Sequence, residues 1–159
     1  MCKKKIMNTI VGVWNNENRG KTETLRALAN IIDTTFPNSI IFCSAENGIP
    51  IKGDFRIVFK IIDAYLGIET GGDPGINLLD NLYQLADVFH CSIIICATRT
   101  NGNNTEAVDV FANTRDFQTI WTSTYQTPDP NNHERLNLLK ANHIWDLIQR
   151  LDLISVNSL

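Results

Sequence analysis

Short apolar runs alternate along this chain with stretches in which apolar residues recur every three or four positions. The runs are typical of buried β-strands, and the three-to-four spacing is typical of helices with one buried face. The expected strands are residues 9–14, 39–45, 56–62, 64–69, 92–98 and 119–123. The expected helices are residues 21–34, 77–89, 105–117 and 132–151. This alternation predicts an α/β fold.

Most of the expected strands are apolar throughout, which favours a parallel sheet covered on both faces. We therefore predict a three-layer sandwich with a mainly parallel central sheet of about five strands. Residues 56–62 and 64–69 lie close together in sequence, so they are expected to form a hairpin or a paired edge. Ligands of such sheets bind beyond the carboxyl ends of the strands. The loops expected there are residues 15–22, 69–75, 99–104 and 123–126.

The composition is that of one globular domain spanning residues 1–159, with 43% hydrophobic and 19% charged residues. A formal net charge of -3 gives no reason to expect nucleic-acid or membrane binding. The four cysteines form no C-x-x-C pair and share no zinc-type spacing with the three histidines. We therefore expect free thiols, a cytoplasmic location and no structural metal.

A sequence with the pattern of a phosphate-binding loop lies between the first strand and the first helix. The competing interpretation is a chance G-K-T tripeptide at a helix start. Residues 15–22 read N-N-E-N-R-G-K-T, and Gly20, Lys21 and Thr22 directly precede or begin the helical pattern. Amide groups of such a loop and the helix dipole favour a polyanion, and the lysine adds a full charge. The motif resembles the Walker A loop of the P-loop NTPase superfamily, G-x-x-x-x-G-K-[ST]. This resemblance implies a P-loop NTPase-like fold.

Two glycines of the superfamily loop are replaced in this chain, the leading one by Asn15 and a second by Asn18. Asparagine enters left-handed backbone geometry more readily than most residues, so we expect a conservative replacement. The resemblance implies that the loop binds a nucleotide. The residues assigned to nucleotide binding are Asn15, Asn16, Asn18, Arg19, Gly20, Lys21, Thr22, Glu23 and Tyr125.

The resemblance also implies an acidic residue that holds Mg²⁺ at the end of an apolar strand. Glu69 occupies that place, and Asp73 is the alternative acid four residues later. We assign Thr22 and Glu69 to the metal and Asp73 to orienting water or shaping the loop. Alternatively, both acids are ordinary turn residues.

Arg99 follows the strand at 92–98 and is the candidate for stabilising charge on a transferred phosphoryl group, beside Lys21. A solvated loop charge is the competing interpretation. Tyr125 follows the last strand, where it would stack on the base or merely cover the core. Trp121 and Trp145 are expected to pack inside the protein. The guanine-reading sequence N-K-x-D is absent from the chain, which favours ATP over GTP.

Two functions follow from the resemblance. The first is Mg²⁺-dependent ATP binding with phosphoryl transfer to an unknown small-molecule acceptor, or with hydrolysis. The second is a module that binds nucleotide without turnover and acts through a protein partner.

Overall fold

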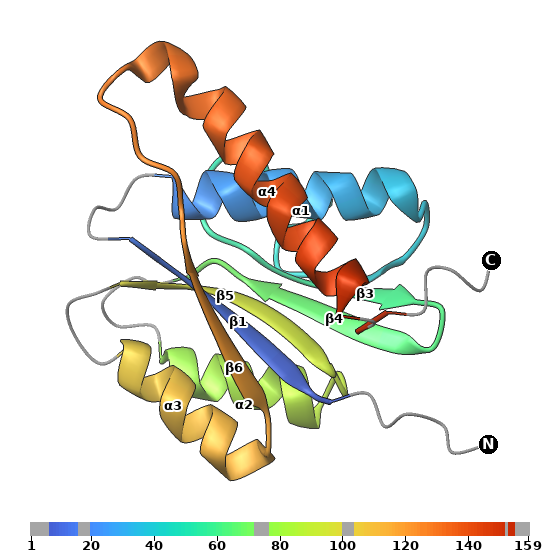
Figure 1. Cartoon of the computed structure of the whole chain (residues 1–159). Coiled ribbons are helices and arrows are strands. Elements are labelled where there is room, and N and C mark those ends of the chain that lie inside the picture. Colours follow the sequence, from blue (N-terminus) through green and yellow to red (C-terminus); the bar gives the residue numbers. More distant parts are fainter. Residues whose placement is uncertain (1–6, 16–19, 72–76, 100–103, 152, 155–159) are drawn as a thin grey trace.

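The computed structural model describes residues 7–15, 20–71, 77–99, 104–151 and 153–154 (Figure 1). Its strands are β1 (Thr9–Asn15), β2 (Ile40–Cys43), β3 (Arg56–Ile61), β4 (Ala64–Glu69), β5 (Ile93–Arg99) and β6 (Gln118–Ser123). Its helices are α1 (Lys21–Thr35), α2 (Leu78–Asp87), α3 (Asn104–Arg115) and α4 (His133–Arg150), with a 3₁₀ turn, η1, at Pro130–Asn132. The predicted strands and helices are all present, with ends that shift by one or two residues.

The strands form one six-stranded sheet in the order β2-β3-β4-β5-β1-β6. β4, β5, β1 and β6 run parallel to one another, whereas β3 pairs antiparallel with both β2 and β4. The predicted hairpin is confirmed, and its turn places Ile62 at a φ of 56°. The sheet is therefore mixed, and it has six strands where about five were expected.

Helices cover both faces of this sheet. Figure 1 shows α1 and α4 on one side and α2 and α3 on the other. Each side has its own apolar core: Val11, Val13 and Leu25 belong to the first, and Ile10, Leu82 and Phe111 to the second. Because side chains of a strand alternate between faces, β1 contributes neighbouring residues to both cores. The expected three layers are thus observed.

A local side-chain hydrogen bond sets the start of α2. The Asn77 side chain accepts a hydrogen bond from the Asp80 amide at 3.3 Å and so caps α2.

Cys91 and Cys96 are buried free thiols, and burial raises the pKa of the Cys91 thiol to about 12. Trp145 is buried as expected, but Trp121 remains 39% exposed. The Trp121 ring nevertheless packs on Gly12 of β1, and its partial exposure follows from the position of β6 at the edge of the sheet.

Within the described residues, none of the helices has the length and apolar character needed to cross a membrane.

Candidate functional site

The four parallel strands β4, β5, β1 and β6 have their carboxyl ends on the same side of the sheet, as predicted. Asn15 at the end of β1 pairs with Arg99 at the end of β5, and Trp14 pairs with Ser123 of β6. Glu69 at the end of β4 pairs with Cys96 of β5. The segments predicted to carry function therefore leave the sheet from the same side.

Lys21 lies at this edge as the first residue of α1. Its side chain is only 6% exposed, and its Nζ donates a hydrogen bond to the Thr98 carbonyl at 2.7 Å. Gly20, the residue before the helix, has a φ of 92°, which a glycine adopts without strain. A buried ammonium is costly unless it is hydrogen-bonded or meets negative charge. The fold thus holds a positive charge at a helix N-terminus, beside the ends of β1 and β5.

Several predicted site residues lie outside the described residues: Asn16, Asn18, Arg19 and Asp73. Arg99 is the last residue of β5, and its side chain is also outside the described part of the chain. The roles assigned to these five residues stay predictions.

The structure gives a different explanation for the asparagine at position 15 from the one that the sequence suggested. It is the last residue of β1 and is not among the described residues with positive φ, so left-handed geometry does not explain the asparagine. Its side chain is 2% exposed. The Asn15 Nδ2 donates to the Thr124 Oγ1 at 2.6 Å, and its Oδ1 accepts from the Gln126 Nε2. Asn15 therefore links the end of β1 to the segment after β6.

Asp54 is a further candidate residue, which the sequence pattern did not indicate. Its Oδ1 accepts a hydrogen bond from the Thr22 hydroxyl at 3.0 Å and lies 3.3 Å from the Thr70 hydroxyl. Asp54 is exposed, so its carboxylate faces solvent beside the first turn of α1. A signal was available in the predicted hairpin. Because β3 is antiparallel to β4, the residues that precede β3 must lie beside the end of β4.

Arg26 holds the segment before β3 against α1. Its side chain is largely buried and donates to the carbonyls of Pro50 and Gly53, the latter at 3.1 Å. It also pairs with Glu23 at 3.1 Å, so Glu23 is engaged within its own helix. Thr70 secures the other end, because its hydroxyl accepts from the Phe55 amide at 2.7 Å. These bonds fix the position of Asp54.

Glu69 is buried and paired. Its side chain is 4% exposed, its Oε1 accepts from the Gly71 amide at 3.0 Å, and its Oε2 lies 3.1 Å from the Arg56 Nε. Burial raises the pKa of Glu69 to about 7, although Arg56 and the Gly71 amide act in the opposite direction. Asp54 adds a smaller upward contribution. Of the two carboxylates, only that of Asp54 is open to solvent.

Tyr125 lies on the surface and contacts α4. Its ring is 40% exposed, its hydroxyl is 2.6 Å from the His143 Nδ1, and the Lys140 Nζ lies 5.3 Å from the ring centre. Its contacts are with His143 and Lys140 of α4. Whether it stacks on a base stays a prediction.

Within the described residues, no group of three or more His, Cys, Asp or Glu side chains is arranged to hold a metal ion. A cation near Thr22 and Asp54 would have to take its remaining ligands from phosphate and water. That arrangement suits Mg²⁺, which usually keeps several waters and uses one or two carboxylates.

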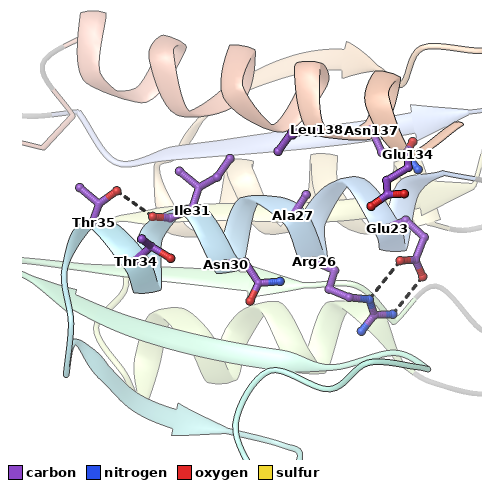
Figure 2. A pocket seen from close by; sticks show the side chains of 10 residues that line it. All are labelled: Glu23, Arg26, Ala27, Asn30, Ile31, Thr34, Thr35, Glu134, Asn137 and Leu138. Carbon is purple, nitrogen blue, oxygen red and sulfur yellow. Dashed lines mark hydrogen bonds and ion pairs between the residues drawn. The ribbon is translucent and has the colours of Figure 1, made fainter. Parts of the chain in front are cut away.

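A groove of about 740 Å³ lies beside α1, where α4 rises away from it. Figure 2 shows that Ala27, Ile31 and Leu138 form its apolar part, and that Glu23 and Glu134 stand at one end. The lining begins one residue after Thr22 and includes neither Lys21 nor Asp54. The groove is therefore next to the candidate phosphate site rather than part of it.

Comparison with known proteins adds no relative: no protein-family model, curated protein or solved structure matches this chain. The function must therefore be argued from the site itself.

Proposed function

We propose that this protein binds the phosphates of a purine nucleotide, ATP in preference to GTP, at the N-terminus of α1. The observation that carries this proposal is the buried ammonium of Lys21, held 2.7 Å from the Thr98 carbonyl where four parallel strands end. A buried cation at a helix N-terminus matches a polyanion in charge and position. The resemblance of residues 15–22 to a Walker A loop supports the same assignment.

In this proposal, Lys21 contacts the β- and γ-phosphates, and the backbone around Gly20 donates to phosphate oxygens. The Thr22 hydroxyl would help to hold Mg²⁺, which would supply positive charge to the phosphates. We assign the carboxylate beside this metal to Asp54, since it already accepts a hydrogen bond from Thr22 at 3.0 Å. Glu69, the acid expected from the sequence, is paired with Arg56 and buried, which supports a role in holding β3 to β4.

For the reaction, we propose phosphoryl transfer or hydrolysis, with Arg99 as the residue that stabilises developing charge. The contacts of Glu69 support a different function, in which the protein binds nucleotide without turning it over. A carboxylate engaged by Arg56 and the Gly71 amide is poorly placed to hold the metal that phosphoryl transfer needs, so nucleotide binding without turnover, with action through a protein partner, is the alternative.

The experiment is titration calorimetry of ATP and GTP, with and without Mg²⁺, on the wild type and Lys21→Ala. Lys60→Ala is the matched control, because Lys60 lies near the hairpin turn of β3, at the opposite edge of the sheet. We expect saturable binding that Lys21→Ala weakens at least about 100-fold, since a charge-assisted contact in a buried site is lost. Lys60→Ala should bind as the wild type does.

If neither nucleotide binds at millimolar concentration, the proposal is wrong. If binding is observed, an assay for phosphate release or transfer that depends on Lys21 distinguishes an enzyme from a binding module.

A further inference from the structure

Asn15 connects two segments that the sequence separates by more than a hundred residues. Its side-chain amide bonds both the Thr124 hydroxyl, at 2.6 Å, and the Gln126 amide. Thr124 is itself 5% exposed, and its backbone amide donates to the Trp14 carbonyl at 3.3 Å. The first residue of the candidate phosphate loop thus holds the segment 124–126 in place.

The identity of this residue depends on its side chain rather than its backbone. Asn15 ends a strand without positive φ, so the position does not require glycine. A glycine here would remove a donor from the buried Thr124 hydroxyl and an acceptor from Gln126. A buried polar group that loses its partner costs about 1–3 kcal/mol, so the Asn15 side chain stabilises this contact.

The segment that Asn15 holds carries an exposed aromatic ring. Tyr125 lies between the two anchored residues, and its hydroxyl reaches His143 on α4 at 2.6 Å. The Lys140 Nζ is 5.3 Å from the ring centre and also donates to the Thr122 hydroxyl at 2.6 Å. His143 thereby holds the hydroxyl of Tyr125, and Asn15 holds the two residues on either side of it. An exposed, immobilised aromatic ring offers a surface on which a base can stack.

We infer that Asn15 is a positioning residue that sets segment 124–126, with Tyr125, against the nucleoside part of the bound nucleotide. This inference rests on the proposed function. It separates the binding free energy into two parts: Lys21 and the loop backbone hold the phosphates, and the segment held by Asn15 contacts base and sugar.

The test compares Mg²⁺-ATP with Mg²⁺-tripolyphosphate, which has the phosphates but no nucleoside. Titration calorimetry would use the wild type, Thr124→Val, Thr124→Ser and Gln126→Ala. Thr124→Val keeps the shape and loses the hydroxyl, whereas Thr124→Ser retains it.

We expect Thr124→Val and Gln126→Ala each to lower ATP affinity about 5- to 10-fold, which corresponds to one lost hydrogen bond. Tripolyphosphate affinity should stay within about twofold of wild type, and Thr124→Ser should restore ATP binding. Asn15→Gly should reduce the preference for ATP over tripolyphosphate, and adding Gln126→Ala to it should have little further effect. Hydrogen exchange at 124–127 should be slowed by ATP in the wild type but not in Asn15→Gly.

An unchanged ratio of ATP to tripolyphosphate affinity in Thr124→Val and Gln126→Ala would overturn the inference and leave the proposed function standing. Equal tightening of both ligands by Asn15→Gly would also overturn it, because Asn15 would then be only a defective loop glycine. If the wild type binds neither ligand, the inference and the proposed function fail together. Gln126 is exposed, so its variant tests the inference even if Asn15→Gly does not fold.

Discussion

Two carboxylates near the end of β4 differ in ways that their sequence positions do not reveal. Asp54 is exposed and bonded to Thr22, whereas Glu69 is buried and paired with Arg56. A metal ion gains from a carboxylate only if it can reach it without breaking an existing ion pair. At the scale of single residues, these contacts therefore favour Asp54 over Glu69 as the acid beside the proposed Mg²⁺.

Asp54→Asn should weaken Mg²⁺-ATP binding by about 10-fold while changing metal-free ATP binding little. The reason is that the amide keeps its bond to the Thr22 hydroxyl but loses the negative charge that attracts the cation. Glu69→Gln is the matched comparison and should retain the Mg²⁺ dependence. Calorimetry with Mg²⁺ and with EDTA measures both. Loss of Mg²⁺ dependence in Glu69→Gln alone would reverse the assignment.

Glu69 should make the stability of the metal-free protein depend on pH. Its pKa is about 7 in the folded protein and 4.5 ordinarily, so between these values the folded state binds a proton that the unfolded state lacks. The free energy of unfolding should therefore fall by up to about 3 kcal/mol as pH rises from about 4.5 to 7, and then level off.

Urea unfolding of the wild type, Glu69→Gln and the exposed control Glu46→Gln, at pH 5 and pH 8, measures this loss. Glu69→Gln should remove most of the pH dependence, and Glu46→Gln should keep it. Equal pH dependence in all three proteins would show that Glu69 is ionised throughout.

At the scale of elements, the contact between β1 and β6 depends on a glycine. A Cβ added to Gly12 would lie 2.4 Å from the Trp121 Cζ3 and 2.5 Å from its Cε3, so the indole ring rests directly on this strand. β6 is an edge strand, and its Trp121 ring is 39% exposed. The ring therefore covers this part of β1 on one side and faces solvent on the other.

Gly12→Ala should destabilise the protein by about 1–3 kcal/mol, because the ring must swing away from β1. Urea unfolding and the tryptophan emission spectrum measure the loss of stability and the ring movement. The double variant Gly12→Ala, Trp121→Ala should show clearly less than the sum of the two single effects. Additive effects, or an unchanged stability in Gly12→Ala, would contradict the close contact.

The sequence predicted elements well and contacts between distant segments poorly. Apolar runs and helical spacing located the six strands and four α-helices that the described residues form, because both signals are local. The direction of β2 and the position of Asp54 depend on which strands pair, and the residues before β3 look like an ordinary loop. Asn15 shows the same limit: its partners Thr124 and Gln126 are more than a hundred residues away, so its role was ascribed to backbone geometry.

At the scale of the whole molecule, the layered fold brings separate functional segments to one edge. The two apolar cores fix four parallel strands between helices, and those strands deliver Asn15, Glu69, Thr98 and Thr124 to a common side. The net charge of -3 opposes a polyanion at long range. The proposed nucleotide binding would therefore depend on local groups, among them the buried ammonium of Lys21.

The most direct test of this account is a ³¹P NMR titration of Mg²⁺-ATP with the wild type, Lys21→Ala and Lys60→Ala. The β- and γ-phosphate resonances should shift and broaden with the wild type and with Lys60→Ala, and should stay at their free positions with Lys21→Ala. Unperturbed phosphate resonances with the wild type, or equal shifts with Lys21→Ala, would contradict the claim that the N-terminus of α1 holds the phosphates.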